Sequence, residues 1–180
     1  VQLDTMVKEP QALSVSLESG TTTDSVSCYG GADGKIRLTV SGGIPDYSYN
    51  WSEIGAADLD SLINLSAGNY SVTVSDSKGC QEVKNYKIGQ PLPLLIEATV
   101  TDAACPATAD GMIDITVTGG VTTYAYAWEV VVQGNTSLSS PSSEDQSGLL
   151  PGSYKVTVTD QKSCTTESTS IVGNISPVPT

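Results

Sequence analysis

The chain has 180 residues, of which 20 are acidic and 8 basic, so its net charge is −12. This acidity argues against a nucleic-acid partner, because binding to phosphates requires Lys and Arg, and against attraction to anionic lipid. Without histidine, the chain has no Ser–His or Cys–His nucleophile pair and no imidazole metal ligand. No apolar run reaches the roughly 20 residues of a membrane-spanning helix, so we expect no membrane insertion. The start at Val1, without Met or a signal pattern, indicates a piece of a longer protein.

Alternating apolar and polar residues predict short β-strands, because successive side chains of a strand point to opposite faces. In the first half these segments are residues 13–17, 36–40, 47–51, 59–65 and 70–74. In the second half they are residues 96–100, 113–117, 124–128 and 154–158. Turn formers such as Gly42-Gly43 and Gly134-Asn135 separate them. No helical period occurs, so the sequence predicts an all-β fold.

The chain also contains an internal duplication. Residues 28–51 align with residues 105–128 without a gap, and 12 of the 24 pairs are identical. Residues 68–80 align with residues 152–164, with 8 of 13 pairs identical, and both blocks end in Cys. The second copy carries seven extra residues between its blocks, where residues 130–133 and 136–140 are a candidate extra hairpin. The duplication predicts two domains, residues 9–90 and 91–178.

Short strands in units of about 80–90 residues predict two tandem immunoglobulin-like antiparallel β-sandwiches. A Trp midway through each unit has the size to fill the space between two sheets. The Tyr of Gly-x-Tyr-x-Val-x-Val stands where such domains place a corner tyrosine that bonds back to the chain. The Asp-Gly pairs Asp33-Gly34 and Asp110-Gly111 are expected to form turns. The aromatic residues expected in the cores are Tyr47, Tyr49, Trp51, Tyr70, Tyr124, Tyr126, Trp128 and Tyr154.

Four cysteines, two per unit at matched positions, indicate a disulfide framework in an oxidising, extracellular compartment. Of the three connectivities, symmetry favours Cys28–Cys80 and Cys105–Cys164, each bond stabilising its unit by roughly 4 kcal/mol in the chain-entropy model. The two cysteines of a unit meet at one end only if an odd number of strands separates its two aligned blocks. Residues 59–65 supply one such strand. Zinc is not expected, since no Cys-x-x-Cys spacing occurs.

The combined motifs resemble the SprB repeat, named for the giant surface adhesin of gliding Bacteroidetes. They are Cys-x4-Asp-Gly-x-Ile, Val-[Ser/Thr]-Gly-Gly, Tyr-x-Tyr-x-Trp, Gly-x-Tyr-x-Val-x-Val-x-Asp and a closing Cys, in both copies. The second copy departs from the pattern at Thr122, opposite Pro45, and at Ser163, opposite Gly79. The resemblance implies an exported cell-surface protein with many such repeats, delivered by type IX secretion and linked to gliding motility or surface attachment.

A tandem arrangement of this kind predicts a structural and adhesive role without a cofactor. The segment Gly89-Gln90-Pro91-Leu92-Pro93 is a short linker whose prolines restrict the backbone, so we expect a semi-rigid stalk. Weak binding of each repeat to a surface polysaccharide or an abiotic surface would be multiplied by effective concentration. The other expected partners are further repeats of the same chain, and the chain itself is expected to be a monomer.

The alternative function is a carbohydrate-binding or accessory module of a secreted hydrolase. Such a module needs solvent-facing aromatic side chains, and Tyr29 and Tyr86 are the only tyrosines outside the repeated pattern. An enzyme is not expected, because His is absent and turn carboxylates such as Asp76 and Asp160 are expected to bond their own backbone. No catalytic or metal-binding residue is therefore assigned.

The sequence leaves open two further possibilities, calcium binding and glycosylation. Asp58-Leu-Asp60 or the turn aspartates could bind calcium, although no Asp-x-Asp-x-Asp-Gly loop occurs. Three triplets resemble the three-residue O-glycosylation signal of the Bacteroidetes: Asp4-Thr5-Met6, Asp24-Ser25-Val26 and Asp60-Ser61-Leu62.

Overall fold

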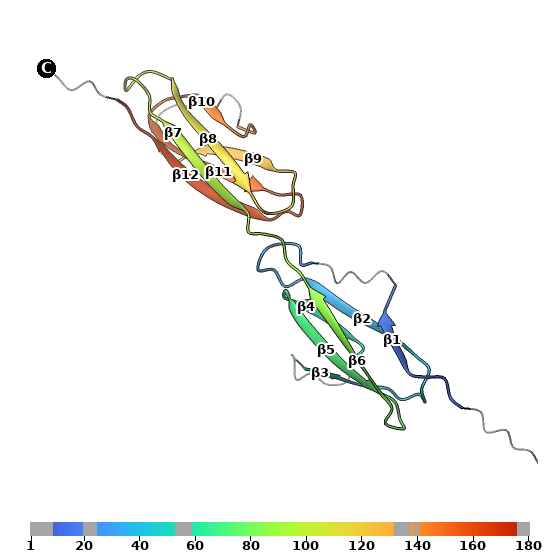
Figure 1. The fold of residues 1–180 in the computed structure, drawn as a ribbon. Helices are drawn as coiled ribbons and strands as arrows, with labels where there is room; N and C mark the ends of the chain where they lie inside the picture. The colour runs from blue at the N-terminus through green and yellow to red at the C-terminus, as the bar shows by residue number, and fades with distance from the viewer. Residues whose placement is uncertain (1–8, 20–24, 53–58, 132–137, 139–140, 176–180) are drawn as a thin grey trace, which may run out of the picture. The chain divides into compact units, whose positions relative to one another are not determined.

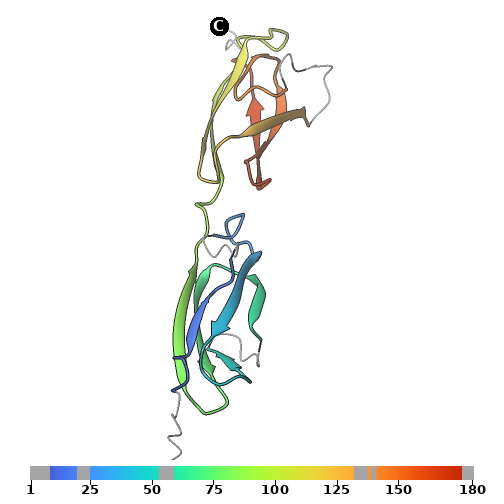
Figure 2. The same cartoon turned by 90° about the vertical axis from the view of Figure 1, so that its right-hand side faces the viewer.

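The computed structural model describes residues 9–19, 25–52, 59–131, 138 and 141–175, which form β-strands joined by turns and loops. The chain divides into two compact units, Val1–Gln90 and Pro91–Thr180, each built from two β-sheets (Figures 1 and 2). The described residues include no helix of the length and apolarity needed to span a membrane. The predicted all-β fold of immunoglobulin-like sandwiches is confirmed.

Two three-stranded antiparallel sheets make up the first unit. One has the strand order β1-β2-β4 and the other the order β3-β5-β6. The strands are β1 Ser14–Leu17, β2 Gly34–Ser41, β3 Ser48–Trp51, β4 Ser61–Leu65, β5 Gly68–Ser75 and β6 Gln81–Ile88.

The second unit repeats this arrangement strand for strand. Its sheets have the orders β7-β8-β10 and β9-β11-β12, again with antiparallel pairing. The strands are β7 Leu95–Thr101, β8 Gly111–Thr118, β9 Ala125–Val130, β10 Gln146–Leu149, β11 Gly152–Thr159 and β12 Thr165–Val172. The candidate extra hairpin at residues 130–140 lies mostly outside the described residues.

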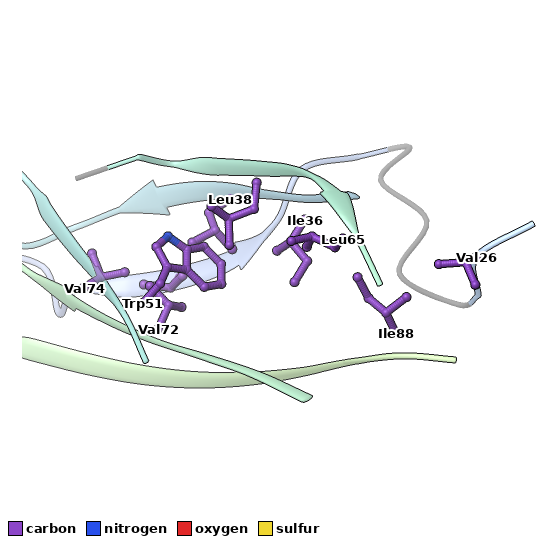
Figure 3. Close-up of a cluster of buried hydrophobic side chains, with 10 residues drawn as sticks. Val26, Ile36, Leu38, Trp51, Leu65, Val72, Val74 and Ile88 are labelled. Atoms are coloured by element: carbon purple, nitrogen blue, oxygen red, sulfur yellow. The ribbon is translucent and has the colours of Figure 1, made fainter. Parts of the chain in front are cut away.

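A hydrophobic core fills the space between the two sheets of each unit. In β2 the buried Ile36 and Leu38 alternate with exposed residues, as the sequence predicted. Trp51 is only 2% exposed, and Figure 3 shows it beside Leu38 and Val74. The second core includes the buried residues Ile113, Ile115, Trp128, Tyr154, Val156 and Val158.

The chain enters the first unit at one end and leaves it at the other. The Gly43 amide donates to the Gln11 carbonyl (2.7 Å), so β1 begins beside the Gly42-Gly43 loop; we call this the entry end. The Val26 amide donates to the Gly89 carbonyl (3.0 Å), so β6 finishes beside residues 25–30; we call this the exit end.

The second unit has the same two ends. At its entry end the Gly120 amide donates to the Leu92 carbonyl (2.9 Å), and at its exit end the Ala103 amide donates to the Gly173 carbonyl (3.1 Å). The first and last strands of each unit therefore run in the same direction, from entry to exit. Short parallel bridges, Ser25 with Gly89 and Ala103 with Asn174, lie at the two exit ends.

Gly34 and Gly111 do not lie in turns, so this part of the sequence prediction was wrong. They are the first residues of β2 and β8. A Cβ atom on Gly34 would lie 2.7 Å from the Leu65 carbonyl oxygen, and one on Gly111 would lie 2.5 Å from a methyl carbon of Val172. These glycines are required because neighbouring strands approach closely at the exit end, not because a turn needs their backbone freedom.

Candidate functional site

The repeated aromatic residues belong to the cores and their edges. The Tyr70 hydroxyl donates to the Ser66 carbonyl (2.8 Å) and the Tyr154 hydroxyl to the Leu150 carbonyl (2.7 Å), which is the geometry of a tyrosine corner. The Trp51 indole N–H donates to a carbonyl of its own unit (2.9 Å). Four further aromatic residues are half-buried against the cores: Tyr47, Tyr49, Tyr124 and Tyr126.

A buried aspartate at each entry end ties two loops together. One carboxylate oxygen of Asp76 accepts from the amides of Lys78 (2.9 Å) and Cys80 (2.8 Å), and the other accepts from the Ile44 amide (2.9 Å). The hydrogen bond from Ile44 is the largest cause that lowers the pKa of Asp76. The carboxylate thus fastens the β5–β6 turn, which contains Cys80, to the loop that follows β2.

Asp160 has the same role in the second unit. It accepts from the amides of Lys162 (2.8 Å), Cys164 (2.9 Å) and Val121 (2.8 Å). Burial raises the pKa of Asp160, but the three amide hydrogen bonds outweigh it and leave that pKa below its usual value. Ser163 stands where the first unit has Gly79 and adopts a positive φ of 66° like that glycine, so the turn keeps its form without glycine.

A second pair of aspartates holds the exit-end loops that contain the first cysteine of each unit. Asp33 accepts from the Ser27 amide (2.9 Å) and from the Ser27 hydroxyl, and these hydrogen bonds, the hydroxyl first, lower the pKa of Asp33. Asp110 accepts from the Ala104 amide (3.0 Å) in the same position of the second unit. Each cysteine therefore lies next to an anchored backbone segment.

The state of the cysteines corrects the predicted pairing within each unit. Cys28 and Cys164 are disulfide-bonded, whereas Cys80 and Cys105 are exposed free thiols. The predictions of Cys28–Cys80 and Cys105–Cys164 bonds were therefore wrong.

The physical reason is the direction of one strand in each unit. β3 and β4 both run from the entry end to the exit end, as do β9 and β10, so the chain does not reverse once per strand. The second cysteine then follows β5 or β11 at the entry end, while the first precedes β2 or β8 at the exit end. The eight residues of β6 or β12 separate them by about 27 Å at ~3.4 Å per residue, far beyond the ~7 Å limit of a disulfide.

The described residues contain no group of three or more His, Cys, Asp or Glu side chains placed to hold a metal ion. Asp58, one residue of the calcium hypothesis, lies outside the described residues, as does Thr5 of the first glycosylation triplet. Of the other two triplet hydroxyls, Ser25 is exposed and Ser61 is half-buried in β4.

The family model described as the SprB repeat matches residues 20–56 and 97–132. Both matched segments contain the first cysteine, the Asp-Gly pair, the Gly-Gly loop and the Tyr-x-Tyr-x-Trp strand of one unit. The family model thus matches once in each unit, consistent with two tandem SprB repeats, and the two units are called repeats from here on.

A search of curated proteins finds no match. Solved structures with similar folds include the three N-terminal domains of the Highly Immunogenic Outer Capsid protein of bacteriophage RB49. This match has a TM-score of 0.47 and 16% sequence identity, and it covers 91% of this chain and 59% of that one. The match to the N-terminal eight Ig domains of Down Syndrome Cell Adhesion Molecule has a TM-score of 0.48 and 11% sequence identity, and it covers 80% of this chain and 25% of that one. The match to Sidekick-1 immunoglobulin domains 1–5 has a TM-score of 0.43 and 12% sequence identity, and it covers 96% of this chain and 41% of that one. The chain thus spans less than two thirds of each of these structures.

The SprB match supports an adhesin-type repeat module. Domains of this repeat type are generally not catalysts. The expectation of an extracellular protein agrees with this family and with the presence of a disulfide.

One surface groove involves a residue singled out for the alternative function. It lies on β5 and β6 of the first SprB repeat and is lined by Asn69, Tyr70, Ser71, Asn85, Tyr86 and Lys87. The Tyr86 hydroxyl oxygen is buried without a hydrogen-bond partner among the described residues, and burial raises its pKa. Tyr29, by contrast, is 58% exposed. The amides of the groove carry no motif, which is why sequence reasoning missed them.

Proposed function

We propose that the two SprB repeats are a structural and adhesive segment of a large exported bacterial cell-surface adhesin. In this proposal the segment is part of a semi-rigid stalk, and each repeat adds a weak contact with a surface. Export by the type IX route and a role in gliding motility or surface attachment complete the proposal, and they rest on what the SprB resemblance implies.

The observation that carries the proposal is the position of the two ends of each repeat. Each sandwich receives the chain at its entry end and releases it at its exit end, so repeats can follow one another without long connections. The linker of the two repeats contains Pro91 and Pro93, which restrict its backbone. Contacts that are weak singly become strong when many copies act together at high effective concentration.

Attachment of coated beads tests the adhesive part. Beads carrying the oxidised chain at increasing density would be applied to glass, polysaccharide gels and bacterial cells, and the force needed to detach them would be measured. We expect attachment to rise more steeply than in proportion to density, because several contacts must act together.

Two controls separate adhesion by folded repeats from charge and stickiness. The first is the chain with Trp51→Ala and Trp128→Ala, in which both cores lose their largest buried side chains. The second is an unrelated acidic protein of similar net charge. No attachment at any density would contradict the adhesive role and leave the repeats as spacers.

A carbohydrate contact in the β5–β6 groove is the second candidate function. The side-chain amides of Asn69 and Asn85 and the ammonium group of Lys87 line this groove, and such groups hydrogen-bond sugar hydroxyls. Asn69→Ala with Asn85→Ala should then abolish bead attachment to polysaccharide gels. The equivalent pair of the second repeat, Ser153→Ala with Thr169→Ala, is the matched control, and equal attachment by both variants would exclude the groove.

A further inference from the structure

The outward side of one sheet in the first repeat differs in chemistry from the rest of this acidic chain. This sheet consists of β3, β5 and β6 (Figure 1). Successive side chains of a strand point to opposite faces, so every second residue points away from the core. We call this surface the amide face: it consists of every second residue of β3 from Ser48, of β5 from Asn69 and of β6 from Gln81. All of these residues except Val83 and Lys87 carry a hydroxyl or an amide group.

No residue of the amide face carries a carboxylate, although the chain has 20 acidic residues. Glu82 is the acidic residue of these three strands, and its side chain points the other way, where it accepts from the Val15 amide (2.7 Å). The charge on the face is the ammonium group of Lys87, which is exposed. The amide face is therefore a neutral to weakly positive surface on a chain whose net charge is −12.

A hollow lies in the amide face between β5 and β6. Its volume is about 350 Å³, within the range of small-ligand pockets, roughly 300–1,000 Å³. The cross-strand pairs Asn69–Lys87 and Ser71–Asn85 line it. Asparagine amides and serine hydroxyls both donate and accept hydrogen bonds. The lining is therefore suited to a ligand that also carries donors and acceptors side by side.

The corresponding surface of the second repeat, on β9, β11 and β12, is engaged in its own ion pairs. The Lys155 ammonium group, which stands where the first repeat has Ser71, lies 2.7 Å from Glu129 and 3.4 Å from Glu167. Glu167 stands where the first repeat has Val83. The amide face is therefore a property of the first repeat and not of the fold that both repeats share.

We propose that the amide face of the first repeat binds an uncharged polysaccharide. This inference rests on the carbohydrate contact proposed above, and it adds the class of glycan and the surface that selects it. Sugar hydroxyls donate and accept hydrogen bonds, as do the side chains of Asn69, Ser71 and Asn85. Because the face has no carboxylate, a neutral glycan chain that covers it buries no unpaired negative charge. An acidic polysaccharide is disfavoured, because the net charge of −12 repels it.

The amide face does not have the chemistry of a protein-binding surface. The centre of a protein interface holds aromatic or other large apolar side chains, whereas Val83 is the apolar side chain of this face. A basic partner would find no carboxylate on the face with which to pair. An extended neutral glycan is the occupant whose groups match the hydroxyls and amides of all three strands.

Native electrophoresis of the whole chain in gels that contain a soluble polysaccharide tests the inference. The neutral probes are dextran, galactomannan and hydroxyethyl cellulose, and the acidic probe is alginate. We expect at least one neutral probe to retard the chain and alginate not to retard it. An unrelated acidic protein of similar net charge corrects for the sieving effect of each polysaccharide.

A charge introduced into the amide face tests whether this surface makes the contact. Val83→Glu places there the acidic residue that the second repeat has at the corresponding position, so the fold is expected to accept it. It should weaken binding to the neutral probe about tenfold, because the new carboxylate would be covered without a partner. Ser14→Glu, at an exposed position of β1 in the other sheet, is the matched control. It adds the same charge and should bind like the wild type, and circular dichroism verifies that both variants are folded.

The outcomes separate this inference from the proposals on which it rests. Retardation by alginate that equals or exceeds that by the neutral probes would overturn the inference but leave the carbohydrate contact standing. Unchanged binding by Val83→Glu, or equal losses in both variants, would overturn the assignment to the amide face. No retardation by any probe would overturn both the inference and the carbohydrate contact. The adhesive role would then still be decided by the attachment of beads to glass and bacterial cells.

Discussion

At the scale of single residues, the first glycine of each Gly-Gly loop permits a close backbone approach. Gly42 has a positive φ of 68°, and a Cβ atom there would lie 1.9 Å from the Ala12 carbonyl oxygen. Gly119 has a φ of 77° and the same relation to Pro93 in the second repeat. The chain that leads into the first strand passes over these glycines, so the motif Val-[Ser/Thr]-Gly-Gly is a packing requirement at the entry end.

Gly42→Ala should destabilise the first repeat by about 2–5 kcal/mol, because a left-handed backbone strain is added to an overpacked contact. Gly79→Ala is the matched control, since Gly79 also has a positive φ (82°) but nothing within 4 Å of its added methyl group. The control should cost only about 1–2 kcal/mol. Urea unfolding measures both values, and equal costs would show that the approach to Ala12 has no energetic weight.

At the scale of elements, Asp76 and Asp160 connect parts of the chain that are remote in sequence. The Asp160 carboxylate joins the β11–β12 turn to the loop after β8. An Asn side chain at this position would present an N–H group to one of the backbone amides. The carboxylate of Asp160 is therefore required because both of its oxygens must accept hydrogen bonds.

Asp160→Asn should lower stability at neutral pH and reduce its acid dependence. The folded-state pKa of Asp160 lies below the usual value, so its contribution is present above the unfolded-state pKa, about 3.9, and is lost as pH falls through the folded pKa. Thermal unfolding between about pH 7 and pH 2 measures this dependence of stability on pH.

Some acid dependence is expected to remain in the variant, because Asp76 and Asp33 also have lowered pKa values. Asp114→Asn, on the exposed face of β8, is the control, and an identical acid profile in both variants would contradict the role of Asp160.

Most strands with an apolar face were predictable from the sequence, but β6, β10 and β12 were not. In β6 the half-buried positions are Glu82, Lys84 and Tyr86, while the apolar Val83 is 56% exposed. Glu82 accepts from the Val15 amide (2.7 Å) and pairs with Lys84 (2.8 Å), so polar contacts hold the inward face. When polar residues occupy the inward positions of a strand, the sequence shows no alternation of apolar and polar residues from which the strand could be predicted.

The predicted cysteine pairing was wrong because the sequence gives no information on strand direction. Symmetry between the copies placed the four cysteines correctly in corresponding loops, yet it gave no information on strand direction. The shared direction of β3 and β4 decides which end Cys80 occupies. No residue pattern in the sequence signals this shared direction.

At the scale of the whole molecule, the two repeats are separate compact units, each with its own core, so we expect each to unfold as its own cooperative unit. Under reducing conditions, Trp51→Ala should destabilise the first repeat by about 3–5 kcal/mol and leave the unfolding of the second unchanged. Scanning calorimetry should then show two transitions. Trp128→Ala is the mirror-image control and should shift the other transition. A single transition that moves as a whole in both variants would contradict independent unfolding.

The shared direction of the first and last strands has a mechanical consequence for a repeat that is placed under tension. Tension applied to the two ends of one repeat pulls its first and last strands apart lengthwise. In the second repeat the backbone bonds from Ala103 to Gly173 and from Ile175 to Ala103 (3.1 and 2.9 Å) connect these regions at the exit end. These hydrogen bonds are perpendicular to the direction of the applied force, so they are loaded in shear. They must therefore break together and not one after another. Resistance to such a load is set by the rate of unfolding and not by equilibrium stability, so a small sandwich of modest equilibrium stability can still withstand a brief load.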